Sequence, residues 1–281
     1  MPVSVWRNKF SNTQQGRSYG AALSFIFIVM KKTLSLILFA SLLFAVGCEK
    51  EPVVTPADPG THDTPDNPEP RVYQALSGVF SVSGTTQVRF AAGNLGYDTS
   101  YFFTSHQYDY GGHFCWGTGN NPTSTSSDYH DYPTFVDWGG IIGDGWRTLS
   151  RPEWKYLIEQ REDAIDKRGE ATVCGVHGLV ILPDTWNGPA FNPVISEWNS
   201  NVYDAASWAT METAGAVFLP AAGLVQNMNL TSEGVFGHYW LSTPNDDNYG
   251  FDFYFGVAVN AITYNDRSDG LSVRLAQDIR P

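Results

Sequence analysis

Residues 146–157 read Trp-Arg-Thr-Leu-Ser-Arg-Pro-Glu-Trp-Lys-Tyr-Leu, and this stretch decides the fold because it encodes the start of a helix. Ser150 has the side chain of a good N-cap, and Glu153, three residues later, completes a capping box. Pro152 is tolerated in a first helical turn, where its missing N–H removes no hydrogen bond. A helix is therefore predicted to begin directly after Ser150.

The residues that follow continue with helical spacing. Trp154, Leu157 and Ile158 recur at positions i, i+3 and i+4, so one face of the helix is apolar and suited to a core. Gly169 stands where a helix commonly ends in a left-handed residue. We therefore expect a helix over residues 151–168, whose side chains provide stability rather than chemistry.

The composition indicates a loop-rich globular protein with many aromatic anchors. Aromatic residues make up 14% of the chain and charged residues only 16%, with 27 Gly and 16 Pro. There are 17 Lys and Arg against 29 Asp and Glu, for a formal net charge of -12. Such an acidic surface repels phosphate backbones, so nucleic acid is excluded as a partner.

The amino-terminal part resembles an exported, lipid-anchored sequence. Residues 31–48 combine two lysines, an uncharged apolar run and a small residue before a cysteine, which is typical of a secretion signal. Residues 45–48, Ala-Val-Gly-Cys, resemble the bacterial lipobox, in which the cysteine is acylated. The resemblance implies an outer-membrane lipoprotein, displayed at the cell surface and anchored to the membrane through Cys48. A short membrane anchor that ends in an incidental cysteine is the alternative.

These features divide the chain into four parts. Residues 1–29 are read as an upstream extension of the reading frame, because Met30 directly precedes the lysines of the signal. Residues 30–47 form the lipoprotein signal peptide. Residues 48–72 contain the acylated cysteine and a tether rich in proline and acids, which cannot bury enough apolar surface to fold. Residues 73–281 carry no linker-like composition and are expected to form a single domain.

Within this domain, short apolar runs alternate with turn residues, as in a sheet protein. Strands are expected at residues 79–83, 87–91, 101–103, 107–110, 179–183, 216–220, 235–243, 251–255, 258–264 and 271–276. A second helix is expected over residues 205–214, burying Trp208 and Met211 and followed by Gly215. No Cys pair or Cys/His spacing resembles a metal site, so the two cysteines of the domain are expected to be thiols.

Several segments of the domain resemble known families. Residues 146–157 are similar to the W-R-L-P-T-x-x-E-W-x-x-L segment of formylglycine-generating-enzyme-like domains. The segments that resemble the Fibrobacter succinogenes major paralogous domain, found in Bacteroidetes surface lipoproteins, are residues 80–83, 88–95, 178–183, 216–223, 237–243 and 270–275. The resemblance covers about residues 78–276. It implies an α+β, C-type-lectin-like fold with two helices around a short antiparallel sheet and long loops.

The resemblance does not extend to chemistry. Formylglycine-generating enzymes use a close pair of cysteines near the carboxyl end to bind copper, whereas no cysteine follows Cys174 here. The chain also lacks a G-x-S-x-G elbow, a phosphate loop and a dinucleotide fingerprint. We therefore expect no enzyme and no catalytic residue. A divergent enzyme of the formylglycine-generating or hydrolytic kind is the alternative, because carboxylate pairs for glycoside cleavage depend on tertiary structure.

The carboxyl-terminal segment is the candidate binding region. From residue 245 to residue 269, 12 of 25 residues are Asn, Asp or Tyr. Phe251, Phe253 and Phe255 alternate along a predicted strand and should face the core, which turns Asp252 and Tyr254 to the other side. Tyrosine offers contact area and Asn or Asp offers hydrogen bonds. The residues expected to bind ligand are Trp240, Asn245, Asp246, Asp247, Asn248, Tyr249, Asp252, Tyr254, Asn260 and Tyr264.

These observations predict a surface-anchored, non-catalytic lipoprotein whose carboxyl-terminal loops recognise a glycan or a protein. An ordinary solvated sheet face is the competing interpretation of the same residues. A structural or adhesin component of a surface assembly, of the fimbrial-tip type, is the alternative function. We expect no cofactor and no metal ligand. Calcium is the open alternative, because residues 245–248 offer carboxylates but lack the spacing of an EF-hand loop.

Overall fold

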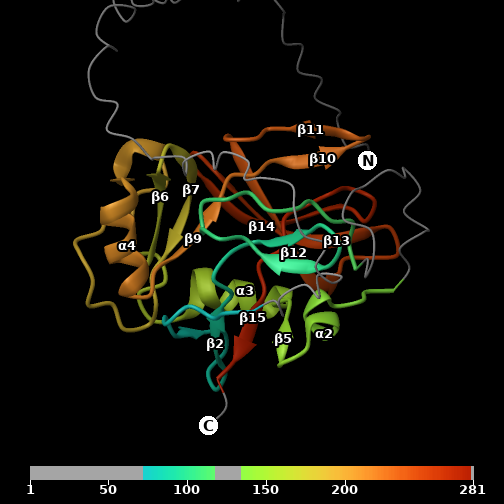
Figure 1. The fold of residues 1–281 in the computed structure, drawn as a ribbon, viewed down its shortest axis with the longest axis horizontal. Coiled ribbons are helices and arrows are strands. Elements are labelled where there is room, and N and C mark those ends of the chain that lie inside the picture. The colour runs from blue at the N-terminus through green and yellow to red at the C-terminus, as the bar shows by residue number, and fades with distance from the viewer. Residues whose placement is uncertain (1–71, 118–133, 280–281) are drawn as a thin grey trace, which may run out of the picture. The chain divides into compact units, whose positions relative to one another are not determined.

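The computed structural model describes residues 72–117 and 134–279, all within the unit that runs from Pro56 to Pro281 (Figure 1). The expected upstream extension, the signal peptide and the anchoring Cys48 lie outside the described residues, as does His130.

Strands dominate the described residues and form five small sheets. Their orders are β1-β2-β15-β5, β8-β6-β7-β9, β12-β13-β14, β3-β4 and β10-β11. The strands are β1 Phe80–Ser81, β2 Gln87–Phe90, β3 Leu95–Tyr97, β4 Tyr101–Phe103, β5 Trp146–Arg147, β6 Arg168–Val173, β7 Val176–Ile181, β8 Val202–Tyr203, β9 Val217–Pro220, β10 Leu224–Gln226, β11 Asn229–Thr231, β12 Phe236–Pro244, β13 Tyr249–Gly256, β14 Val259–Asp266 and β15 Ala276–Asp278. The helical segments are α2 Trp138–Ile142, α3 Arg151–Lys155, the π-helical η2 Tyr156–Gln160, the 3-10 turn η3 Trp198–Ser200, and α4 Ala205–Thr213.

The expected α+β, C-type-lectin-like fold is wrong. Strands and bridges account for 38% of the described residues and helices for 14%, so the structure is mostly β and not two helices around one short sheet. In Figure 1, α4 stands at the margin of the sheet that contains β6, β7 and β9. The strands form five separate sheets in place of one, and the helix predicted over residues 151–168 ends at Gln160.

That helix begins as predicted. Ser150 and Glu153 form the capping box, and the Ser150 N–H donates to Glu153 Oε2 at 2.8 Å. Trp154 faces the core, where its ring stacks on Phe253 with centroids 4.8 Å apart. The predicted start of the element and its buried face are therefore confirmed.

Its end is set by Arg161. This residue leaves the helical conformation at φ -64° and ψ 160°, and its Nε donates to the carbonyl of Leu157 at 2.8 Å. The same guanidinium donates to the Leu182 carbonyl at 2.8 Å. A buried arginine thus caps the carbonyl end that a longer helix would have satisfied internally. Gly169, predicted to end the helix, lies instead within β6.

The second predicted helix is confirmed as α4. Asp204 caps it, with its carboxylate accepting the Ser207 N–H at 2.8 Å. Trp208 and Met211 are buried against the β6–β7–β9 sheet. Gly215, at φ 98°, then turns the chain into β9.

Most predicted strands are confirmed with shifted ends, but two are wrong. Residues 107–110 form a turn, because the buried Gln107 side chain accepts the Phe218 N–H and so fixes the chain there. Residues 271–276 make isolated bridges rather than a strand, and only Ala276 enters β15. Since residues 107–110 form no strand, β4 pairs with β3.

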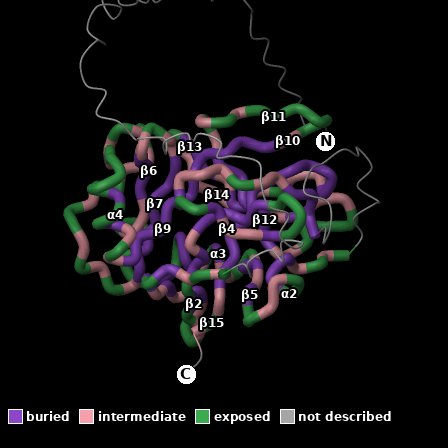
Figure 2. Tube along the Cα trace, in the orientation of Figure 1, coloured by how far each residue is buried: buried purple, intermediate pink, exposed green. Residues whose placement is uncertain are grey.

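The core lies between the β12–β13–β14 sheet and the β7–β9 strands. Phe253 and Phe255 are fully buried there with Tyr239, as the alternating pattern predicts. Figure 2 shows buried segments along β12, β7 and β9, whereas β11 is exposed along its length. One face of the three-stranded sheet is therefore committed to the core.

A buried cation, Arg274, connects several segments around this core through hydrogen bonds. Arg274 is 2% exposed, and its guanidinium donates to Gln107 Oε1 at 2.6 Å and to Asn94 Oδ1 at 3.2 Å. Gln107 in turn donates to Glu212 of α4 at 2.8 Å. Asn94 donates to the Tyr239 hydroxyl of β12 at 3.0 Å. Burial lowers the pKa of Arg274 to about 10, so the group is still charged at neutral pH.

We expect Arg274→Met to lower the free energy of unfolding by about 2–4 kcal/mol, because Asn94 and Gln107 lose a charged donor inside the core. Urea denaturation measures the change. Arg89→Met, at an exposed position of β2, is the matched control and should change the free energy by less than about 0.5 kcal/mol. Equal effects of the two substitutions would contradict the role given to Arg274.

Candidate functional site

The candidate site is a pocket on the face of the β12–β13–β14 sheet that turns away from the core. Its volume is about 360 Å³. The β10–β11 hairpin forms one wall, and the sheet strands form the floor and the other wall. The lining residues are Leu224, Gln226, Phe236, His238, Tyr254, Thr263, Tyr264 and Asn265.

Strand register explains why these side chains meet. Paired residues on neighbouring antiparallel strands share a face, and His238 pairs with Tyr254 while Asp252 pairs with Thr263. Asn265 pairs with Gly250 on the same face. Side chains that are far apart in the sequence are therefore collected on one surface.

The hairpin wall is fixed by its backbone. Asn227 and Met228 both have positive φ, at 48° and 65°, as a two-residue type I′ turn requires. Val225 and Gly270 exchange two backbone hydrogen bonds of 2.8 Å, which attach β10 to the segment after β14. This attachment carries Gln226 to the pocket.

A buried histidine–aspartate pair forms the floor. His238 Nδ1 and Asp252 Oδ2 lie 2.8 Å apart, and the residues are 8% and 0% exposed. Burial raises the pKa of Asp252, while the hydrogen bond with His238 opposes that rise. His238 lines the pocket, and Nε2 of its ring makes no hydrogen bond within the described residues. This nitrogen is therefore available to a bound molecule.

Acidic groups surround the floor. Asp269, 6% exposed, accepts a hydrogen bond from Gln226 Nε2 at 2.9 Å. Burial raises the pKa of Asp269 to about 6, and the nearby Asp266 and Asp252 carboxylates add to the rise. Lysine and arginine are absent from the pocket lining among the described residues. The site is therefore negatively charged at neutral pH.

Aromatic rings form the upper part of the pocket. The Tyr254 ring lies against His238, with centroids 4.8 Å apart, and against Phe236 at 5.2 Å. Tyr264 pairs with Phe251 and so turns its ring to the other face of the sheet, where it is 53% exposed and contacts the Tyr249 ring, with centroids 5.4 Å apart. The pocket thus combines ring surfaces with a polar floor.

Two of the predicted ligand-binding residues are buried, which corrects the expectation that Asp252 faces outward. Trp240 is 1% exposed and donates its indole N–H to the Phe114 carbonyl, so it is a core residue. Asp252 does turn away from the core phenylalanines, but the face it occupies is covered. Trp116 packs against Gly250 beside it, and the chain around Ser272 runs along β12. The alternation of residues in the sequence identifies which face of the strand Asp252 occupies, but not the chain segments that cover this face.

The predicted residues at the β12–β13 turn lie at the far end of the strands from His238. Asp246 there accepts the N–H groups of Asn248 and Tyr249 at 2.8 and 3.0 Å, which fixes the turn. Asn245 and Asp247 are exposed at the same turn. These residues remain a predicted binding region that is separate from the pocket.

The other predicted residues divide between the two faces of the sheet. Tyr254 faces the pocket beside His238, whereas Tyr264 lies at the edge of the pocket and pairs with Phe251, which turns its ring to the other face. Asn260 pairs with Phe255 and shares the core side, with both amide atoms buried. Gln226 and His238 were not predicted as site residues, because an isolated Gln or His carries no spacing signal in the sequence.

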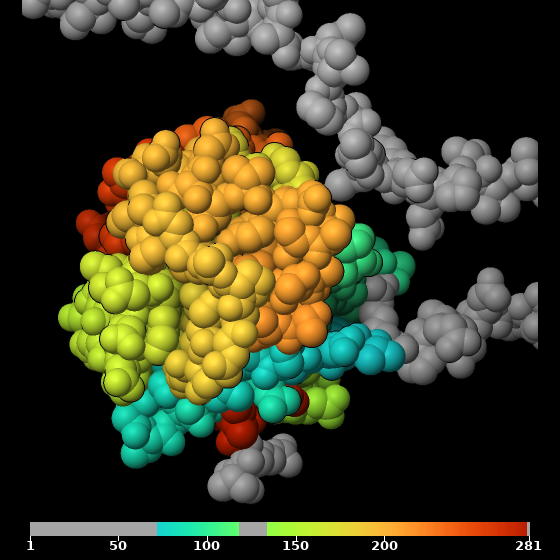
Figure 3. Space-filling view, turned by 90° about the vertical axis from the view of Figure 1, so that its left-hand side faces the viewer, coloured from blue at the N-terminus to red at the C-terminus, as the bar shows by residue number. Residues whose placement is uncertain are grey.

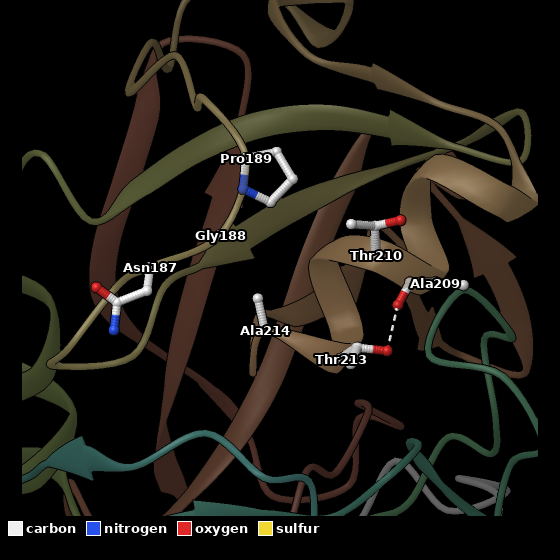
Figure 4. Close-up of a pocket in the computed structure, with 7 residues that line it drawn as sticks. All are labelled: Asn187, Gly188, Pro189, Ala209, Thr210, Thr213 and Ala214. Carbon is white, nitrogen blue, oxygen red and sulfur yellow. Dashed lines mark hydrogen bonds between the residues drawn. The ribbon is translucent and has the colours of Figure 1, made fainter.

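A second hollow, of about 630 Å³, lies between α4 and the loop at residues 187–189 (Figure 4). Figure 3 shows the face on which α4 and the preceding loop lie, in gold and orange. The threonine hydroxyls that line this second hollow already make hydrogen bonds. Thr213 donates to the Ala209 carbonyl at 2.7 Å, and Thr210 donates to the Ala206 carbonyl at 3.2 Å. The lining is otherwise mostly small and apolar, so we place the candidate site in the first pocket.

A buried carboxyl group also lies outside the pocket. Glu170 of β6 is 0% exposed, and neither of its oxygens has a well-formed hydrogen bond among the described residues. Burial raises the pKa of Glu170 to about 7, against a smaller opposing effect of the Ala258 backbone. The group is therefore neutral below that pH in the folded protein and costs stability above it.

We expect Glu170→Gln to stabilise the protein at pH 8 by about 1–2 kcal/mol and to have little effect at pH 4. In the unfolded chain the carboxyl group ionises near pH 4.5, while in the folded protein it holds its proton to about pH 7, so wild-type stability falls between these values. Urea denaturation across this range measures the difference. Glu162→Gln, at an exposed position, is the control. A gain at pH 8 no larger than the change at pH 4 would contradict the assignment.

Side chains suited to a metal ion and helices suited to a membrane are both absent from the described part of the chain. No group of three His, Cys, Asp or Glu side chains that could hold a metal ion occurs in residues 72–117 and 134–279. No helix in these ranges is long and apolar enough to cross a membrane. Cys115 and Cys174 are both thiols, as predicted, and Cys115 donates to the Ser268 carbonyl at 3.4 Å.

Comparison with known proteins gives one match. A family model described as a domain of unknown function, DUF8237, matches residues 198–276. Every residue that lines the pocket lies within this span. No curated protein and no solved structure matches the chain.

Proposed function

We propose that this protein binds a carbohydrate in the pocket on the β12–β13–β14 sheet. The observation that carries the proposal is the combination of aromatic rings with a buried histidine–aspartate floor in one concave site. Sugar rings present apolar C–H faces and polar hydroxyl edges. Tyr254 and Phe236 offer surfaces for the faces, while His238, Thr263 and Asn265 offer hydrogen bonds to the edges.

The dimensions favour a small part of a glycan. A volume of about 360 Å³ lies at the lower end of small-molecule sites and suits one or two sugar units. The pocket is open at the edge of β14, beside the exposed Tyr264, so the rest of a glycan chain can extend outward there. This arrangement supports recognition of a terminal or branching unit.

We propose binding rather than catalysis. General-base chemistry at a His–Asp pair uses a nucleophile within hydrogen-bond reach of the imidazole. Among the described residues, no serine, threonine or cysteine side chain is hydrogen-bonded to His238, and the pocket lining contains neither serine nor cysteine. Without such a group, the pair serves to orient a ligand.

The sequence supports a place for this activity. The secretion signal and the lipobox-like residues 45–48 favour a lipoprotein of the outer membrane, displayed at the cell surface. The proline-rich segment that follows Cys48 would act as a tether. A tethered domain gains reach, and many anchored copies bind a polyvalent glycan more tightly than one copy does.

Replacing Tyr254 and Phe236 together by alanine should weaken glycan binding roughly tenfold or more, because both ring surfaces of the pocket are lost. A glycan array identifies the ligand, and titration calorimetry of the strongest sugar measures the loss.

Tyr97→Ala is the matched control, since this tyrosine is 37% exposed on β3, outside the pocket. Circular dichroism of each variant establishes that it is folded. An array without any sugar signal, together with a stoichiometric protein partner captured from the cell envelope, would overturn the proposal in favour of a protein ligand or a structural assembly.

A further inference from the structure

We infer that the ligand of this pocket carries an amine, whose ammonium group donates a hydrogen bond to Nε2 of His238. The inference rests on the proposed carbohydrate-binding function and narrows its ligand to amino sugars. It follows from the hydrogen bonding of the floor, from the charges around it and from the rings above it.

The floor is built to accept a proton donor. Asp252 Oδ2 lies 2.8 Å from His238 Nδ1, so the neutral ring holds its proton on Nδ1, facing the carboxylate. Nε2 then carries a lone pair. His238 is 8% exposed and lines the pocket, and Nε2 makes no hydrogen bond within the described residues. A ligand that fills the pocket satisfies this nitrogen only with an N–H or O–H group.

The surrounding charges favour a cation at that position. Asp252 reaches His238 from β13, and Asp269 lies close to both of them after β14, with Asp266 beside it. The basic residue nearest to Asp269 in the sequence is Arg267. Its guanidinium lies 4.3 Å from the Trp116 ring centroid, and the residue is not part of the pocket lining. A carboxylate, sulfate or phosphate on the ligand would meet like charges here, whereas an ammonium group would meet opposite ones.

The rings above the floor add to the same preference. The Tyr254 ring lies tilted against the His238 ring, at 33° between the ring planes, and contacts Phe236, so aromatic side chains border the position of the donor. Aromatic faces attract cations through their quadrupole, most strongly where water is partly excluded. The site therefore joins an acceptor, a negative field and aromatic walls, which is a suitable environment for an alkyl ammonium group.

Three sugars that share one ring and differ at one carbon test the inference. The probes are 6-amino-6-deoxyglucose, glucose and glucuronic acid, which present an ammonium, a hydroxyl and a carboxylate group. Their binding to the protein is measured by NMR titration at pH 7.5. We expect the amino sugar to bind about tenfold more tightly than glucose and the acid to bind most weakly.

Asp252→Asn provides an isosteric variant. Its amide N–H can donate to Nδ1, which moves the imidazole proton to Nε2 and converts the acceptor into a donor. The amino sugar should then bind no more tightly than glucose at pH 7.5. Nitrogen-15 spectra of the imidazole report the tautomer directly. His106→Phe, at an exposed histidine outside the pocket, is the control.

The outcomes separate the two levels of the proposal. Binding of glucose or glucuronic acid as strong as that of the amino sugar would overturn the amine inference and leave carbohydrate binding in place. Failure of all three sugars to bind, together with a glycan array that shows no sugar signal and with every variant folded, would overturn both. A preference for the amine that survives in Asp252→Asn would also overturn the inference, because it would not depend on Nε2.

Discussion

The structure depends on one buried cation. Arg274 connects Gln107 and Asn94, and through them α4 and β12, inside a core that otherwise consists mainly of apolar side chains. Sheets this small cannot stabilise themselves, because each offers only a few strands over which to bury an apolar face. Hydrogen bonds between side chains of different sheets therefore fix the sheets relative to one another. The charge is retained because its donors are matched to carbonyl oxygens of neighbouring side chains.

The same network positions the pocket. Tyr239 accepts from Asn94 and donates to the Pro220 carbonyl, so β12 is fixed on its core side at that residue. His238 and Trp240, on either side of Tyr239, are thereby turned to the opposite face. Rigid strands rather than loops thus carry the histidine–aspartate floor, and the hydrogen bond of 2.8 Å between them is held by the sheet itself.

Local structure could be predicted from the sequence more reliably than assembly. The capping box at Ser150, the helix α4 and the alternation of Phe253 with Asp252 all follow from neighbouring residues. The fold class could not be predicted, because the division of the strands into five sheets depends on pairings between distant segments, such as β2 with β15 and β7 with β9. For the site, sequence identified Tyr254 but not His238, whose role depends on strand pairing. The burial of Asp252 likewise depends on chain segments that cover its face.

The β10–β11 hairpin forms a border of the pocket that is separate from its floor. Backbone hydrogen bonds between Val225 and Gly270 attach β10, and β11 is exposed along its whole length. Substitutions at its exposed positions, such as Met228 and Leu230, therefore change the border of the pocket and leave the His238–Asp252 floor in place.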